Sequence, residues 1–248
     1  MKIFDFFFSK KETEAFQLPF NTDIHSHIIP GVDDGSKNLE SSIFLVKKLR
    51  EWGIYNIIAT PHRTDISFEN TPDSIKPHFD ALKKEIEKNS IDVNLTHSFE
   101  YRLDEGFIKL MEQKKLVALK DNYILIENSF IQPLWNLKEI IFDLKLKGFK
   151  PILAHPERYG YYINNKNMYT ELHNIECEFQ INIMSIAGGY GKEIQKTAKW
   201  LLEKGYLDYI GTDLHNKSHS DFIDNYLKSS AYKKTLPILA SMVKNDII

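Results

Sequence analysis

The chain has 248 residues, of which 42% are hydrophobic and 27% charged, and its formal net charge at pH 7 is −2. This length suits a single barrel of alternating strands and helices, and the nearly balanced charge argues against a general binder of nucleic acid or anionic membranes. No apolar run approaches the roughly 20 residues that a membrane-spanning helix needs, so we predict a cytoplasmic protein. We expect an N-terminal extension over residues 1–21, whose aromatic cluster at 3–8 packs on the body, and a main domain over residues 22–248.

The first predicted strand, Thr22–His27, ends in two histidines that are one residue apart. Alternate side chains of a strand point the same way, so His25 and His27 project together and can bind one metal ion. The pair alone is a weak signal, because two surface histidines before a turn have the same pattern. A turn-rich loop at residues 30–35 follows, and apolar spacing then predicts a helix over 39–53.

Strands and helices alternate along the rest of the chain. The further predicted strands are residues 54–60, 91–99, 123–126, 151–154, 177–184 and 207–211. Helices are predicted at about 75–86, 107–111, 133–144, 168–174 and 194–205, and in two stretches after 215. Because no Pro/Gly/Ser-rich linker divides this pattern, it predicts one α/β domain with a parallel sheet. We expect a single distorted seven-stranded (β/α) barrel, with a doubly wound open sheet as the alternative.

Ionisable side chains stand where these strands end. They are His25, His27, His62, Glu100, Glu127, His155, Asp213 and His215. The carboxyl ends of parallel strands meet at one edge, where burying such groups without partners would cost several kcal/mol each. Divalent cations supply the compensation, and nitrogen and oxygen donors without a thiolate suit manganese, iron or zinc. We predict two or three metal ions, with a purely stabilising ion-pair network as the alternative.

The only cysteine, Cys177, excludes an internal disulfide and a cysteine-rich metal site. Thiol-dependent tyrosine phosphatases need a Cys-x5-Arg loop, and the residue six positions after Cys177 is Ile183. We therefore predict that Cys177 is a buried small hydrophobic residue. Three of the remaining histidines, His78, His97 and His173, are predicted to be structural or solvent-facing. The sequence does not assign a role to the fourth, His219.

Four motifs carry a resemblance to a known family. They are Asp23-Ile24-His25-Ser26-His27 with Asp33-Asp34-Gly35, then Thr60-Pro61-His62-Arg63, His155-Pro156-Glu157-Arg158-Tyr159 and Thr212-Asp213-Leu214-His215. In their order and spacing they resemble the polymerase-and-histidinol-phosphatase (PHP) superfamily. Within it they are most similar to the bacterial metal-dependent tyrosine phosphatases of the CpsB/YwqE type. The likeness runs from about Thr22 to the last helices and implies a PHP-type catalytic barrel with metal ions at the C-terminal ends of its strands.

The resemblance also implies roles for individual residues. One metal ion would take His25, His27, Glu100 and Asp213. A second would share Glu100 and add Glu127 and His155, and a third would take Asp34, His62 and His215. Glu100 and Arg158 would act in catalysis, and phosphate would be bound by Arg158, Arg63 and Lys217. An arginine expected after the last metal-binding histidine is missing from residues 216–220, so Lys217 or His219 is the nearest replacement.

The implied activity is the hydrolysis of phosphomonoesters by a hydroxide that bridges two metal ions, without a phosphoenzyme. The implied substrate is a phosphotyrosine protein, a bacterial tyrosine kinase that controls capsule or exopolysaccharide synthesis. Two alternatives stay open. One is a small-molecule phosphatase of the histidinol-phosphate type, and the other is a metal-binding interaction module without turnover.

Overall fold

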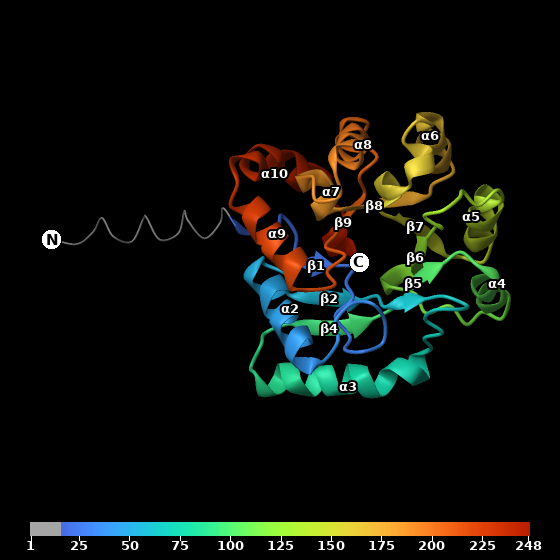
Figure 1. Ribbon diagram of the computed structural model, residues 1–248. Coiled ribbons are helices and arrows are strands. Elements are labelled where there is room, and N and C mark those ends of the chain that lie inside the picture. Colours follow the sequence, from blue (N-terminus) through green and yellow to red (C-terminus); the bar gives the residue numbers. More distant parts are fainter. Residues whose placement is uncertain (1–15) are drawn as a thin grey trace.

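The computed structural model describes residues 16–248, in which parallel strands occupy the centre and helices surround them (Figure 1). One sheet contains, in spatial order, β1 (Thr22–Asp23), β2 (Asn56–Ala59) and β4 (Asn94–His97). The other contains β3 (His62–Arg63), β5 (Glu100–Arg102), β6 (Tyr123–Glu127), β7 (Lys150–Ala154), β8 (Glu178–Asn182) and β9 (Tyr209–Gly211). Every neighbouring pair within these sheets is parallel, which confirms the predicted α/β class.

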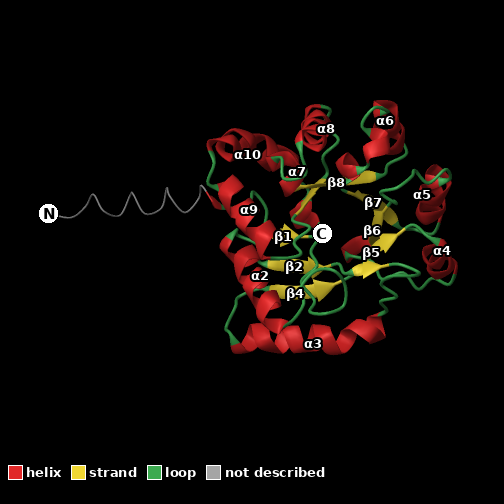
Figure 2. Cartoon of the chain, viewed as in Figure 1, coloured by secondary structure: helices red, strands yellow, loops and turns green. Residues whose placement is uncertain are grey.

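The helices lie outside the strands (Figure 2). They are α2 (Leu39–Glu51), α3 (Pro72–Lys88), α4 (Glu105–Glu112), α5 (Leu137–Leu146), α6 (Lys166–Asn174), α7 (Ile183–Ala187), α8 (Lys192–Glu203), α9 (Lys217–Leu227) and α10 (Ser230–Met242). Helix α3 begins earlier than predicted, because Thr71 caps its first turn and Pro72 needs no hydrogen-bond partner there. Helix α5 begins later than predicted, after a turn over residues 135–136. The predicted strand 177–184 ends at Asn182, and the next residue starts α7.

Two of the predicted strands, 54–60 and 91–99, are each followed by a second short strand that was not predicted. Segment β3 follows β2 after two residues, one of which is Pro61, and β5 follows β4 after two residues. Proline has no backbone N–H to donate to a sheet, which accounts for the first break. The expected count of seven strands is therefore not what the structure shows in residues 16–248, where nine segments are present.

Backbone hydrogen bonds connect the two sheets across these breaks. The amide of Glu100 donates to the carbonyl oxygen of Pro61 at 3.1 Å. At the other side the end of β9 meets the end of β1, where Asp213 N donates to His25 O at 2.8 Å and His27 N donates to Leu214 O at 3.0 Å. These contacts curl the parallel sheet and gather the carboxyl ends of its strands at one mouth.

Apolar side chains fill both faces of the curled sheet. The inner cluster includes Ile24, Leu125, Ile152 and Tyr209, and a larger cluster packs the strands against the surrounding helices. Residues 16–21 join this body, since Leu18 and Phe20 are buried. The aromatic cluster at residues 3–8 lies outside the described residues. Among residues 16–248, no helix combines the length and the apolar character required to cross a bilayer.

Candidate metal centre

The mouth of the sheet brings together all nine residues that were expected to bind metal. Each belongs to at least one group of three or four side chains whose donor atoms lie within 4.8 Å of one another. The groups are His25–His27–Asp213, His25–Glu100–His155, His62–Glu100–Glu127 and His27–Asp34–His62–His215. Residues far apart in the sequence meet here because eight of the nine lie at, or shortly after, the carboxyl end of a parallel strand, and the ninth, Asp34, lies further along the loop that follows β1.

Glu100 lies at the centre of this cluster and is fully buried. Its Oε2 atom lies 3.2 Å from His25 Nε2, 3.4 Å from His27 Nε2 and 3.1 Å from His62 Nδ1. Its Oε1 atom lies 2.9 Å from His155 Nε2. Burial opposes the ionisation of Glu100, but His25 and His62 outweigh it and hold the pKa of this carboxyl well below its usual range. One carboxylate therefore contacts four histidines that follow the ends of three strands, β1, β2 and β7.

Glu127 occupies the edge of the same cluster. Its Oε1 atom accepts a hydrogen bond from Arg102 Nε at 3.0 Å and lies 3.8 Å from His62 Nδ1. Burial, and next the charge of Glu100, raise the pKa of Glu127 to about 7. The Glu127 carboxyl is thus buried beside a second carboxylate, and a cation between the two would favour its ionised form.

Strained backbone places two of the candidate ligands. His155 and Asp213 are non-glycine residues with positive φ angles of 35° and 49°. Such conformations cost on the order of 1–3 kcal/mol each and persist where surrounding structure enforces them. At these two positions the chain turns sharply out of β7 and β9. The strained backbone at His155 and Asp213 is therefore found where both side chains enter the metal cluster.

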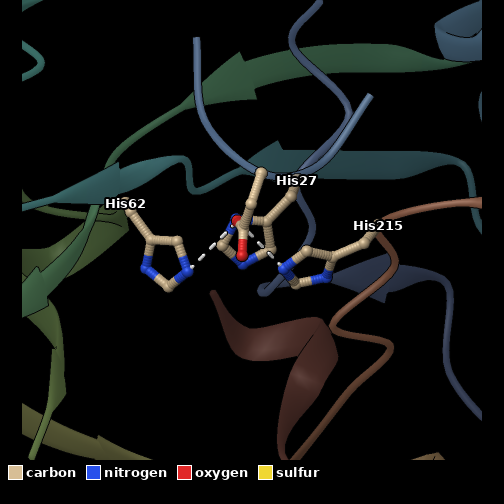
Figure 3. A group of neighbouring side chains, drawn as sticks. His27, His62 and His215 are labelled. Atoms are coloured by element: carbon tan, nitrogen blue, oxygen red, sulfur yellow. Dashed lines mark ion pairs between the residues drawn. The ribbon is translucent and has the colours of Figure 1, made fainter. Parts of the chain in front are cut away.

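The group nearest to solvent contains Asp34. Its Oδ1 atom lies 3.5 Å from His62 Nε2 and 3.4 Å from His215 Nε2, and the rings of His27, His62 and His215 converge on this point (Figure 3). His215, through a hydrogen bond, lowers the pKa of Asp34 to about 2. The Asp34 side chain is 56% exposed, so this part of the cluster opens directly to solvent.

Asp33, the neighbour of Asp34, has a role that sequence reasoning missed. Its Oδ2 atom accepts hydrogen bonds from His27 Nδ1 at 2.8 Å and from the His62 amide at 3.1 Å. The loop fits only with glycine at position 35, because a Cβ atom there would lie 2.2 Å from the His27 carbonyl oxygen. Asp33 thus orients the His27 ring and holds the backbone at His62, and the Asp-Asp-Gly motif was the available signal.

A buried hydrogen-bond relay was also missed. His25 Nδ1 donates to Gln180 Oε1 at 2.6 Å, and Gln180 Nε2 donates to Asn182 Oδ1 at 2.8 Å. Asn182 Nδ2 then donates to Asp213 Oδ2 at 2.6 Å. Polar residues alternate with apolar ones along β8, and the two that are fully buried, Gln180 and Asn182, were the signal for this relay. It fixes the orientation of one histidine and one carboxylate at the same time.

The donor arrangement fits divalent metal. The Nδ1 atoms of His25 and His27 both donate to oxygen acceptors, and the Nε2 atoms of the two rings face each other 3.2 Å apart. In the neutral form that binds a metal ion, these Nε2 atoms carry lone pairs. Among the described residues, His62 Nδ1 and Glu100 Oε2 are buried without a hydrogen-bond partner. Lone pairs that converge in this way need a cation between them. Burial opposes protonation of His25, yet Glu100 and Asp213 raise its pKa to about 9, which shows the same demand for positive charge.

We expect Asp33→Asn to weaken metal binding about 10- to 100-fold, the usual cost of removing a hydrogen-bond partner from a metal-binding histidine. The amide cannot accept as strongly from His27 Nδ1, so the ring loses its fixed orientation. Titration calorimetry with manganese measures the change. Asp65→Asn, on an exposed part of the next loop, is the matched control. Parent-like affinity in Asp33→Asn would contradict the orienting role.

Arg158 is the basic residue that lies in the cavity of the cluster, which has a volume of about 330 Å³. Its Nη1 atom donates to Asp213 Oδ2 at 2.7 Å. The guanidinium centre lies 4.2 Å from the Tyr190 ring centroid and 5.0 Å from that of Phe130. The cation is therefore held between two rings and a carboxylate at the entrance.

The two other expected phosphate-binding residues lie elsewhere. Arg63 is not among the residues that line the cavity. Lys217 is also absent from the lining, is 69% exposed and makes two 2.8 Å hydrogen bonds to Asp221. His219, which had been left open, does line the cavity, and its Nδ1 atom lies 3.3 Å from the Asp213 carbonyl oxygen.

The prediction for Cys177 is confirmed, since its side chain is fully buried and burial raises the pKa of its thiol. The three histidines predicted to be structural also lie outside the cluster. His78 Nδ1 is 2.8 Å from the Pro30 carbonyl oxygen in the described structure, and His173 stacks on Tyr206. His97 lies in β4, where burial lowers its pKa.

Comparison with known proteins identifies the family. Residues 21–223 match the family model described as capsular polysaccharide synthesis, CpsB/CapC. This chain belongs to the CpsB/CapC family. Among its relatives is the tyrosine-protein phosphatase YwqE of Bacillus subtilis, which is 31% identical over 201 residues, covering 81% of this chain and 79% of the relative. The tyrosine-protein phosphatase CpsB of Streptococcus agalactiae is also 31% identical over 201 residues, covering 78% and 82%.

Solved structures agree with this assignment. A crystal structure from the work on YwqE of Bacillus subtilis and CpsB of Streptococcus pneumoniae, described as metal-dependent tyrosine phosphatases, matches with a TM-score of 0.76 at 29% identity. The match covers 91% of this chain and 95% of that structure. Histidinol phosphate phosphatase from Lactococcus lactis matches with a TM-score of 0.52 at 15% identity over 85% of this chain and 93% of that one, which shows a shared fold.

Proposed function

We propose that this member of the CpsB/CapC family is a metal-dependent protein-tyrosine phosphatase. The observation that carries the proposal is the cluster of buried histidines and carboxylates around Glu100, together with relatives that are themselves named tyrosine-protein phosphatases. His62 Nδ1 and Glu100 Oε2 are among the buried polar atoms of the described residues that lack a hydrogen-bond partner, which supports a cation at the cluster.

The cluster suits two or three divalent ions, and manganese is the metal we propose. His25, His27, Glu100 and Asp213 would hold one ion, and Glu100, Glu127 and His155 a second. Asp34, His62 and His215 would hold a third. Such ions lower the pKa of bound water and neutralise charge on the phosphoryl group. The hydrogen bonds between the ends of β1 and β9 support a closed barrel as the scaffold. Its seven staves would be the nine strands, with β2 and β3 counted as one and β4 and β5 counted as one. The division between an N-terminal extension, residues 1–21, and the catalytic domain, residues 22–248, stays a prediction.

The protein's own groups complete the site. Glu100 and Asp213 present oxygens to the histidines around them, and Asp33 and Gln180 hold two of these histidines in one orientation. Arg158 stands at the cavity entrance, where a guanidinium can make two parallel hydrogen bonds to phosphate oxygens. The phenolate of tyrosine is a good leaving group, because the pKa of a phenol is about 10 and lies far below that of an alkyl alcohol. The site therefore needs little acid assistance.

The substrate we propose is a phosphotyrosine protein, a bacterial tyrosine kinase that acts in capsule or exopolysaccharide synthesis. The family description supports a link to capsular polysaccharide. The cytoplasmic location stays a prediction. The deciding experiment compares kcat/KM of the manganese-loaded protein on a phosphotyrosine peptide, the matching phosphoserine peptide and histidinol phosphate. Higher kcat/KM on histidinol phosphate would favour the small-molecule alternative, and no turnover of para-nitrophenyl phosphate would favour a non-catalytic module.

Arg158→Lys is expected to lose about 1.5–3 kcal/mol of transition-state stabilisation, roughly a 10- to 150-fold fall in kcat/KM. Lysine keeps the charge but cannot make the paired hydrogen bonds, and metal content stays unchanged. Lys217→Ala is the matched basic control, and it should cost much less because Lys217 is exposed and pairs with Asp221. The measurement is kcat/KM for both variants on one phosphotyrosine peptide. A fully active Arg158→Lys enzyme would remove Arg158 from the site.

A further inference from the structure

A second, larger hollow opens beside the candidate metal centre. It has a volume of about 800 Å³ and is formed by the loops that follow β3, β5 and β6. It shares Asp34, His62, Glu127 and Phe130 with the cavity of the metal cluster. The two spaces thus adjoin along these four residues, so a group attached to a phosphate at the cluster lies next to the hollow.

Two phenyl rings stand where the hollow meets the cluster. Phe68 stacks on His62, with ring centroids 5.6 Å apart and an interplanar angle of 14°. Phe130 stacks on His155, with centroids 5.5 Å apart and an angle of 22°. Both phenyl rings line the hollow. Aromatic surface therefore adjoins two histidines of the cluster.

Local hydrogen bonds fix the position of Phe68. The Thr64 hydroxyl oxygen accepts from the amides of Ser67 at 3.1 Å and Phe68 at 2.8 Å. The Thr64 amide also donates to the Phe68 carbonyl oxygen at 2.9 Å. Residues 64–68 thus form a closed turn that holds the ring on His62. A ring held in this way loses little freedom when a ligand packs against it.

We propose that Phe68 and Phe130 form a subsite for the aromatic ring of an aryl phosphate, which in the proposed function is the phenol ring of phosphotyrosine. This inference rests on the proposed function, because it takes the metal cluster as the place where the phosphate binds. The ring of an aryl phosphate is bonded directly to the ester oxygen, so it must lie at the entrance when the phosphate reaches the cluster. An alkyl phosphate places only a flexible methylene there. Packing between aromatic rings therefore selects aryl over alkyl esters.

Binding of two phosphonates that cannot be hydrolysed tests the subsite independently of turnover. Titration calorimetry on the manganese-loaded full chain gives Kd for phenylphosphonate and for methylphosphonate. The parent should bind phenylphosphonate more tightly. In Phe68→Ala this preference should fall about five- to tenfold, the effect expected for one lost aromatic contact. Methylphosphonate affinity should stay unchanged, because the metal cluster is intact.

Three further variants test whether the change in preference comes from the aromatic ring at the hollow. Phe68→Tyr keeps the ring and should restore the preference. Phe142→Ala on α5 removes a phenyl ring that is 61% exposed and does not line the hollow, so both affinities should match the parent. Phe130→Ala should also reduce the preference, and it should weaken methylphosphonate binding if its contact with Arg158 matters for phosphate.

Metal content and thermal unfolding are measured on every variant. If Phe68→Ala loses metal because His62 is uncovered, Phe68→Leu keeps an apolar cover on the histidine and carries the test in its place. An unchanged preference in a Phe68 variant with full metal content would overturn the subsite, and so would a parent without preference. A subsite that behaves as expected in a protein that does not hydrolyse phosphotyrosine peptide would overturn the proposed function alone.

Discussion

Glu100→Ala is expected to lower kcat/KM on a phosphotyrosine peptide by at least about a hundredfold, since several kcal/mol of transition-state stabilisation depend on the metal cluster. Glu100 is the buried carboxylate that contacts His25, His27, His62 and His155, so its loss removes a shared partner from four donors. His62→Ala removes one donor at the rim and should cost less. Kinetics and elemental analysis of metal content on both variants measure the difference.

Two variants serve as controls for this result. Glu100→Gln keeps the side-chain volume and removes the charge, so a large loss there excludes a packing defect as the cause. Glu112→Ala changes an exposed carboxylate at the end of α4 and should leave kcat/KM unchanged. Equal residual rates with full metal content in Glu100→Ala and His62→Ala would show that Glu100 is not the central ligand.

Removal of divalent metal is expected to lower activity by more than about a hundredfold, and added manganese should restore it. The thiol, in contrast, is expected to take no part in the reaction. Cys177 is fully buried in the core, away from the cluster, and burial raises the pKa of its thiol, so the nucleophilic thiolate is suppressed.

Cys177→Ser is the matched test of thiol independence. The variant should keep parent-like kcat/KM and metal content, although its free energy of unfolding should fall by about 1–3 kcal/mol because a hydroxyl replaces a thiol in an apolar site. Assays of chelated, manganese-restored and Cys177→Ser protein separate the two chemistries. Loss of activity in a folded, metal-loaded Cys177→Ser protein would overturn the metal-only mechanism.

The alternation of strands and helices could be predicted because apolar periodicity reports which faces are buried. The strand breaks could not, because a break depends on how neighbouring strands pair. Pro61 lies in the break between β2 and β3, whereas the break between β4 and β5 at residues 98 and 99 has no comparable sequence signal. The start of α7 at Ile183 could not be predicted from the sequence either, because an apolar run of this length is compatible with a strand and with a helix.

The candidate ligands could be predicted by type and place, whereas their supporting groups could not. Asp33 and Asp34 are chemically identical neighbours, and only the direction of the loop turns the first to His27 and the second to His62 and His215. Similarly, Arg158 and Lys217 are both basic residues near a strand end. The structure brings the first into the cavity and leaves the second paired with Asp221 at the surface.

The sequence by itself therefore determined the parallel α/β class, the absence of a reactive thiol motif and the set of nitrogen and oxygen donors at the strand ends. Only the tertiary structure decided which atoms face one another. His25 and Gln180 are 155 positions apart in the chain, yet their hydrogen bond selects the ring nitrogen that points into the cluster. Periodicity along a strand shows the face on which a side chain lies. The partner on the neighbouring strand depends on the register and closure of the sheet, which long-range backbone hydrogen bonds set.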